Sequence, residues 1–205
     1  MTRKTTIYDA GKGWLEGCER DDYSQFGEDG LIEAALSHFG ETNRCCFEVG
    51  AADGVFYSNT KRLRDDGWSA LLVEADDRLF AELKQHESDR VICRQAWLHK
   101  QMDWLLAGAK MPRDIDLGVI DIDGNDYSAW AAMEVYRPRL MLIEYSPYAG
   151  DDNPEGSGPF GQAGINPIRQ LGESKRYVLL ATTYCNALFV SKEAMDGVTV
   201  ERRSG

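Results

Sequence analysis

The feature that most constrains the fold is a regular alternation of short apolar runs with segments whose apolar residues follow helical spacing. The expected strands are 45–49, 70–74, 90–94, 117–122, 140–145, 177–182 and 187–190, and the expected helices are 25–39, 58–66, 77–86 and 127–136. Parallel strands need a crossover between them, and a helix is its usual form. The pattern therefore predicts an α/β fold with a mostly parallel sheet covered by helices on both faces.

The alternation of strands and helices changes near the end of the chain. Only residues 183–186 separate the last two expected strands, which is too short for a crossover helix, so these strands should be antiparallel neighbours. We expect one domain over residues 1–205, with an irregular N-terminal arm over 1–22. The Gly- and Pro-rich segment 149–167 is either a substrate loop or lid, or a tolerated surface excursion.

Charge and composition limit the classes of binding partner and the cellular compartment that we expect. The 205 residues include 23 Lys and Arg against 34 Asp and Glu, a net charge of −11, which argues against nucleic acid or an anionic membrane as a partner. The first residues lack the apolar stretch of an export signal. Five cysteines occur without a C-x-x-C pair, and Cys45 and Cys46 are adjacent in an apolar run, so we expect reduced core thiols in a cytoplasmic protein.

A glycine turn follows the first expected sheet strand. Gly50 and Gly54 permit positive φ and close approach of a ligand, at the sheet edge where α/β proteins bind nucleosides. Glu74 ends the next strand, about 20 residues further on, where an acid can accept hydrogen bonds from both ribose hydroxyls. The alternative interpretation is that the glycines only shape a turn and that Glu74 is a surface acid.

The acids around this turn discriminate between nucleoside ligands. The spacing is G-x-x-x-G, and Glu48 and Asp53 flank it, so a pyrophosphate would be repelled and a nicotinamide oxidoreductase is disfavoured. A ligand that carries an ammonium and a sulfonium group would be attracted. These charges favour S-adenosylmethionine.

A second group of acids follows two later strands. Strand alternation would place Asp121 and Asp123 on one side of the sheet, and Glu144 ends the next strand. Such carboxylates can take a proton from a substrate hydroxyl, or with Asn125 hold Mg²⁺. For Asp126, capping of the following helix is an equal alternative.

Several segments together resemble the FkbM-type S-adenosylmethionine-dependent methyltransferases. They are residues 23–30, 47–54, 58–60, 67–68, 120–127 and 143–145, and the resemblance runs from about 23 to 192. It implies the Rossmann-like class I methyltransferase fold, with a seven-stranded sheet whose last strand is antiparallel. It also implies O-methylation of a hydroxyl on a small molecule such as a sugar or secondary metabolite.

The resemblance assigns roles to individual residues. It implies that the methionine part of the cofactor lies by Glu48, Gly50 and Asp53, the ribose by Glu74, and the adenine by Gln95, Ala96 and Trp97, with Gln25, Ser58 and Asn59 closing the pocket. Ala51 and Asp121 are further cofactor-binding candidates. Asp121, Asp123 and Glu144 are the catalytic candidates.

Residues 121–127 are also similar to a motif of metal-dependent catechol-type methyltransferases, in which the first Asp binds Mg²⁺. Gly124 replaces the Lys of that motif, and Glu144 is followed by Tyr145 rather than a second acid. A divalent cation, if one is used, would therefore be held by Asp121 and Glu144.

We predict a methyltransferase that acts on a small-molecule acceptor. The alternatives are an N-methyltransferase for a small amine and a non-catalytic interaction module that keeps the cofactor pocket. The sequence leaves the oligomeric state open, with a homodimer as one option.

Overall fold

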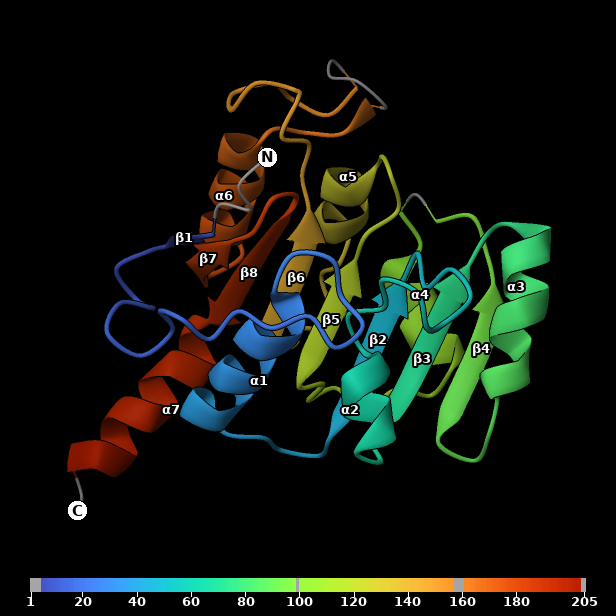
Figure 1. Cartoon of the computed structure of the whole chain (residues 1–205), viewed down its shortest axis with the longest axis horizontal. Helices are drawn as coiled ribbons and strands as arrows, with labels where there is room; N and C mark the ends of the chain where they lie inside the picture. Colours follow the sequence, from blue (N-terminus) through green and yellow to red (C-terminus); the bar gives the residue numbers. More distant parts are fainter. Residues whose placement is uncertain (1–4, 99, 157–160, 204–205) are drawn as a thin grey trace.

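The computed structural model describes residues 5–98, 100–156 and 161–203, with side chains described up to residue 197. Within these residues, one sheet contains eight strands in the order β1-β7-β8-β6-β5-β2-β3-β4 (Figure 1). The strands are β1 (Thr6–Ile7), β2 (Cys45–Val49), β3 (Ser69–Glu74), β4 (Val91–Gln95), β5 (Leu117–Ile120), β6 (Leu140–Glu144), β7 (Tyr177–Thr182) and β8 (Asn186–Ser191). Strands β4, β3, β2, β5 and β6 are parallel neighbours, and β8 is antiparallel to both β6 and β7.

Helices cover both faces of the sheet. They are α1 (Glu28–Phe39), α2 (Lys61–Asp65), α3 (Asp77–Leu83) with the 3-10 turn η1 (Lys84–His86), α4 (Met102–Gly108), α5 (Asp126–Ala131), α6 (Ile165–Ser174) and α7 (Lys192–Arg203). Helices α1, α2, α3 and α7 pack on one face, and α4, α5 and α6 pack on the other. The strands are buried on both sides, which is why they read as continuous apolar runs.

The predicted sheet is confirmed, including the antiparallel pair at the end of the chain. The structure adds one strand: Thr6 and Ile7 pair with Thr182 and Ala181, so the arm is not wholly irregular. The prediction missed β1 because two residues carry no periodicity. Helix α4 lies where no element was predicted, and α6 begins inside the predicted 149–167 loop, at Ile165.

Two predicted elements end early. Strand β5 stops at Ile120 rather than at residue 122, because the Ile122 amide donates to the Asp126 carboxylate instead of to a neighbouring strand. Helix α5 stops at Ala131 rather than at residue 136. The amides of residues 134–136 donate instead to the carboxylate of Asp103.

Cys45, Cys46 and Cys93 are buried core residues, as predicted. Cys18 and Cys185 are only partly buried, and all five cysteines are free thiols.

None of the described helices is long and apolar enough to span a membrane.

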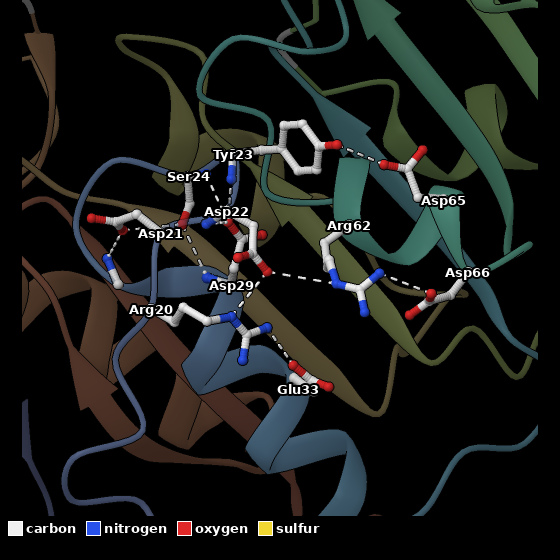
Figure 2. Close-up of polar contacts among 11 residues, drawn as sticks. Arg20, Asp21, Asp22, Tyr23, Ser24, Asp29, Glu33, Arg62, Asp65 and Asp66 are labelled. Carbon is white, nitrogen blue, oxygen red and sulfur yellow. Dashed lines mark hydrogen bonds and ion pairs between the residues drawn. The ribbon is translucent and has the colours of Figure 1, made fainter.

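The N-terminal arm is fastened to helix α1 by a buried carboxylate (Figure 2). Asp29 accepts hydrogen bonds from the backbone amides of Asp22, Tyr23 and Ser24 at 2.9, 2.7 and 2.8 Å. The Ser24 hydroxyl in turn accepts from the Asp29 amide at 3.0 Å. Ser24 therefore satisfies an amide in the first turn of α1, which begins at Glu28 after the N-cap residue Gly27.

Ion pairs extend this attachment to helix α2. Arg20 contacts Asp22 and Glu33, and Arg62 contacts Asp22 and Asp66 (Figure 2). These surface pairs are weaker than the buried Asp29 contacts, because solvent screens exposed charges. The arm is thus fixed just before residues 25 to 28, which reach the carboxyl edge of the sheet.

We expect Asp29→Ala to lower the free energy of unfolding by about 2–3 kcal/mol, because three backbone amides, one buried and two partly buried, lose their acceptor. Urea unfolding measures this. The control is Asp65→Ala, which removes an exposed acceptor of the Tyr23 hydroxyl and should cost less than about 1 kcal/mol. Equal losses in the two variants would contradict the assigned role of Asp29.

Candidate active site

A cleft opens beyond the carboxyl ends of β2, β5 and β6. It has about 740 Å³ of empty space, part of it open to solvent, which suits a ligand of nucleoside size. Eight predicted site residues line it: Gln25, Gly50, Ala51, Ser58, Asn59, Asp121, Asp123 and Glu144. Residues from strands far apart in the sequence therefore meet here, as the parallel sheet requires.

Gly50 brings two strand ends together. Its φ is +81°, and a β-carbon placed on it would lie 1.6 Å from the backbone oxygen of Asp121. The amides of Gly50 and Ala51 both donate to the carbonyl of Val73, at 2.9 and 3.0 Å. The turn after β2 thus rests on the first residue after β5, and only glycine fits both the dihedral angle and the contact.

Glu48 lies behind the cleft rather than in it. Its buried carboxylate accepts hydrogen bonds from the Ser58 hydroxyl at 2.7 Å, the Asn59 amide at 2.7 Å and the Thr60 hydroxyl at 2.5 Å. Burial raises the pKa of this carboxyl group. Glu48 therefore acts on the site by holding Ser58 and Asn59, which do line the cleft.

Glu74 joins the end of β3 to the glycine turn. One carboxylate oxygen accepts from the Ala52 amide at 2.8 Å, and the other accepts from the amides of Ala75 and Asp76 at 2.7 and 2.8 Å. Asp53 folds back onto its own loop, where it accepts from the amides of Val55 and Phe56. Neither acid lines the cleft itself.

The predicted adenine residues follow the next strand, β4. The Ala96 amide donates to the Glu74 carbonyl at 3.1 Å, so Ala96 lies beside the predicted ribose acid. The Trp97 side chain is 86% exposed. Both residues lie outside the cleft lining, further along the same edge of the sheet.

Asp121 and Glu144 form a pair of carboxyl groups in the cleft, close enough for each to influence the pKa of the other. The Asp123 amide donates to Glu144 at 3.0 Å, and the Asn186 side-chain amide reaches Asp121 at 3.5 Å. Burial, and then the charge of Asp123, raises the pKa of Asp121 to about 7. Burial, and then the charge of Asp121, raises the pKa of Glu144 to about 10. Near neutral pH the pair therefore holds one proton between its two carboxyl groups.

The predicted reason for the position of Asp123 is wrong. Asp123 does not alternate along β5, because the strand ends at Ile120 and Asp123 has a φ of +54°. The turn nevertheless brings it to the cleft. Asp126 accepts from the amides of Ile122 and Gly124 and does not line the cleft, which supports its interpretation as a structural residue of this turn.

The sequence analysis missed six residues that line the cleft: Glu28, Ala52, Phe56, Tyr57, Cys185 and Asn186. Glu28 is buried on α1 and accepts from the Thr183 hydroxyl at 2.5 Å and the Phe26 amide at 2.7 Å. Asn186 pairs with Glu144 across β8 and β6. The short β7–β8 connection was a usable signal for Cys185 and Asn186, but only the strand order shows that it ends at the cleft.

Among the described residues, no group of three or more His, Cys, Asp or Glu side chains is arranged to hold a metal ion. Asp121 and Glu144, the predicted ligands, supply two carboxyl groups to the cleft. Another cavity, which includes Trp130, Lys175 and Tyr177, contains none of the predicted site residues.

No protein-family model matches the chain, and no curated protein matches its sequence. Solved structures do resemble it. An O-methyltransferase from Bacillus cereus in complex with S-adenosylhomocysteine is 17% identical with a TM-score of 0.54, over 86% of this chain and 84% of that chain. A predicted O-methyltransferase from Klebsiella pneumoniae is 16% identical with a TM-score of 0.57, over 91% of each chain.

A third similar structure is a predicted caffeoyl-CoA O-methyltransferase from Staphylococcus aureus, 14% identical with a TM-score of 0.56 over 82% of this chain and 84% of that chain. These similarities confirm the predicted fold class. The chain has the α/β Rossmann-like fold of the class I methyltransferases, with the additional edge strand β1.

We expect Gly50→Ala to cost at least about 3 kcal/mol of stability or to prevent folding, because the methyl group overlaps the Asp121 carbonyl. The matched control is Gly13→Ala, where φ is +83° but no atom lies within 4 Å. That variant should cost only about 1 kcal/mol for the positive φ. Urea unfolding of both variants gives the comparison, and similar costs would show that the close contact is unimportant.

Proposed function

We propose that this protein is an S-adenosylmethionine-dependent methyltransferase that acts on a hydroxyl group of a small molecule. The observation that carries the proposal is the cleft in which the Gly50 turn meets the carboxyl pair Asp121–Glu144, at the ligand-binding edge of a class I sheet. The Bacillus cereus structure, an O-methyltransferase with bound S-adenosylhomocysteine, supports it.

The chemistry of the cleft fits the proposed cofactor. Its acids suit a ligand with an ammonium and a sulfonium group. In addition, the side-chain oxygens of Asn59 and Asn186 are buried without a hydrogen-bond partner in the described structure, so both can accept from a ligand. The proposed contacts are Gln25, Gly50, Ala51, Ser58, Asn59 and Asp121 for the methionine part, Glu74 for the ribose, and Ala96 and Trp97 for the adenine. Glu48 and Asp53 hold the loop that carries several of them.

The cofactor supplies an electrophilic methyl group on sulfur. In the proposed mechanism, ionised Asp121 takes the proton of the acceptor hydroxyl as the oxygen forms its bond to the methyl carbon. The carbon–sulfur bond breaks at the same time, and its electron pair stays on sulfur. Glu144 keeps its proton at neutral pH and donates a hydrogen bond to Asp121, while Asp123 helps to set the charge of the site.

A divalent cation is the competing device for activating the hydroxyl, with Asp121 and Glu144 as its ligands. Mg²⁺ takes about six oxygen ligands, so these two groups would need waters or the acceptor to complete the set. Activity measured with EDTA and then with Mg²⁺ separates the two mechanisms.

Further assignments rest on the sequence motifs. We propose membership of the FkbM-type family, from residues 23–30 and 120–127, and a cytoplasmic protein of one domain without nucleic-acid or membrane partners. Residues 149–167 are proposed as a substrate loop, although 157–160 lie outside the described residues. A homodimer is one option for the assembly, which gel filtration with light scattering would decide.

Two other functions keep specific support. Acids beside the exposed rings of Phe56 and Tyr57 also suit an amine, as an N-methyltransferase requires. A non-catalytic module would bind the cofactor and show no turnover with any acceptor.

We expect S-adenosylhomocysteine to bind with micromolar affinity in a calorimetric titration. Glu74→Gln should weaken this binding at least about tenfold, because it removes a charged acceptor for the ribose hydroxyls. The control Glu82→Gln changes an exposed acid of α3 and should leave the affinity unchanged. If the wild-type protein does not bind, the proposed function fails; if Glu74→Gln binds normally, only the role of Glu74 fails.

We expect Asp121→Asn to lose at least about a hundredfold in turnover at saturating cofactor. The rate of the wild-type enzyme should rise with pH up to about 7, because Asp121 must be ionised to accept the proton and its pKa is raised to about 7. A pH–rate profile under single-turnover conditions measures this. A flat profile between pH 5 and 8, or an active Asp121→Asn variant, would remove Asp121 as the base.

A further inference from the structure

We infer that the acceptor is an organic cation, a hydroxyl compound that carries a protonated amine, rather than a neutral or anionic molecule. The inference rests on the proposed function and specifies its substrate class. Three independent features of the cleft carry it: its charge balance, one unpaired buried oxygen and an exposed aromatic wall.

The cleft has a surplus of negative charge. Glu28, Asp121, Asp123 and Glu144 line it, and no Lys, Arg or His occurs among its described lining residues. S-adenosylmethionine has a net charge of only +1, because its carboxylate cancels one of its two cationic groups. An acceptor with a positive charge would offset part of the remainder.

Asn186 adds an unpaired acceptor to this surface. Its side-chain nitrogen lies 3.5 Å from an Asp121 carboxylate oxygen and 3.6 Å from the Cys185 sulfur. The opposite oxygen is buried and has no hydrogen-bond partner within the described structure. Asn186 is only 4% exposed, so burial of that oxygen is compensated only when a ligand or a water donates to it. An ammonium group, with three donors, can serve this oxygen and a carboxylate together.

Two aromatic side chains form the wall of the cleft. Phe56 and Tyr57 are 61% and 48% exposed, and their ring centroids are 3.7 Å apart. Tyr57 has a φ of +59°, a conformation that costs energy for a bulky residue and persists only when neighbouring contacts impose it. Asp53 supplies such a contact by accepting from the Phe56 amide at 2.8 Å. An exposed ring next to carboxylates is the combination that binds organic cations.

The same features disfavour anionic acceptors. A coenzyme A thioester carries several phosphate charges, and proteins bind phosphate through Lys, Arg or helix N-termini. The described lining of this cleft contains neither Lys nor Arg. The acceptor chemistry of this chain therefore differs from that of the Staphylococcus aureus protein predicted to act on caffeoyl-CoA.

Three small phenols of similar shape test the inference: tyramine, 4-ethylphenol and 4-hydroxyphenylacetate, which are cationic, neutral and anionic at pH 7. Their dissociation constants are measured by calorimetry or NMR on protein saturated with S-adenosylhomocysteine, in EDTA and at low salt. We expect tyramine to bind at least about tenfold more tightly than 4-hydroxyphenylacetate, with 4-ethylphenol between them.

Two substitutions test whether the preference for the cationic probe arises from the charge of the cleft. Asp123 is exposed, and Asp123→Asn removes one charge of the cleft without changing side-chain shape. We expect it to reduce the ratio of tyramine to 4-ethylphenol affinity about threefold. The control is Asp89→Asn, the same change at an exposed site away from the cleft, which should leave the ratio unchanged.

Equal affinities, a preference for the neutral or anionic probe, or no binding by any of the three would overturn the inference. So would a preference for tyramine that Asp123→Asn and Asp89→Asn reduce alike, because it would come from the net charge of the protein. Failure of the proposed function is distinguishable, since it shows as absent S-adenosylhomocysteine binding in the first titration, while the order of the probes is still measured on the unliganded protein.

Discussion

The contact between Gly50 and the backbone oxygen of Asp121 is the constraint on which the site depends. It sets the distance between the ends of β2 and β5 and so places the turn and the carboxyl pair in one cleft. Polar contacts around the turn then hold the neighbouring segments that the Gly50–Asp121 contact does not position. Glu48 holds the 58–60 segment from behind, and Glu74 holds Ala52 from the neighbouring strand. Acids that the sequence places around a ligand thus serve largely as acceptors for the backbone that shapes its site.

Two distant parts of the chain close the other side of the cleft. The segment between the arm and α1 brings Gln25, the start of α1 brings Glu28, and the β7–β8 hairpin brings Cys185 and Asn186. Glu28 and Thr183 join these two parts by a buried hydrogen bond. The high pKa values of Asp121 and Glu144 follow from this enclosure, because it removes water from carboxyl groups that face one another. The fold therefore raises the pKa values of these acids by bringing several segments of the chain around them.

Periodicity and strand ends predicted most of the fold and much of the site. Strands that are buried on both faces appear in the sequence as continuous apolar runs, so they could be predicted. The glycine turn and Asp121 were correctly predicted to lie at one edge of the sheet. The two-residue strand β1 gave no signal, and β5 was drawn too long because Ile122 continues its apolar pattern while its amide bonds to Asp126. Glu28 and Asn186 were missed for a different reason. Their roles depend on contacts between elements remote in sequence, which local pattern cannot contain.

The pairing of β1 with β7 has a consequence for the behaviour of the whole molecule. A strand at the edge of a sheet presents unpaired backbone groups to which another chain can add, and β1 covers part of this edge. The segment that follows the arm supplies Gln25 to the cleft. Proteolytic cleavage within the arm would free β1 from β7 and expose that edge of the sheet. It would also release the chain that leads to Gln25 in the cleft. Loss of ligand binding and self-association should therefore appear together in preparations that have been nicked there.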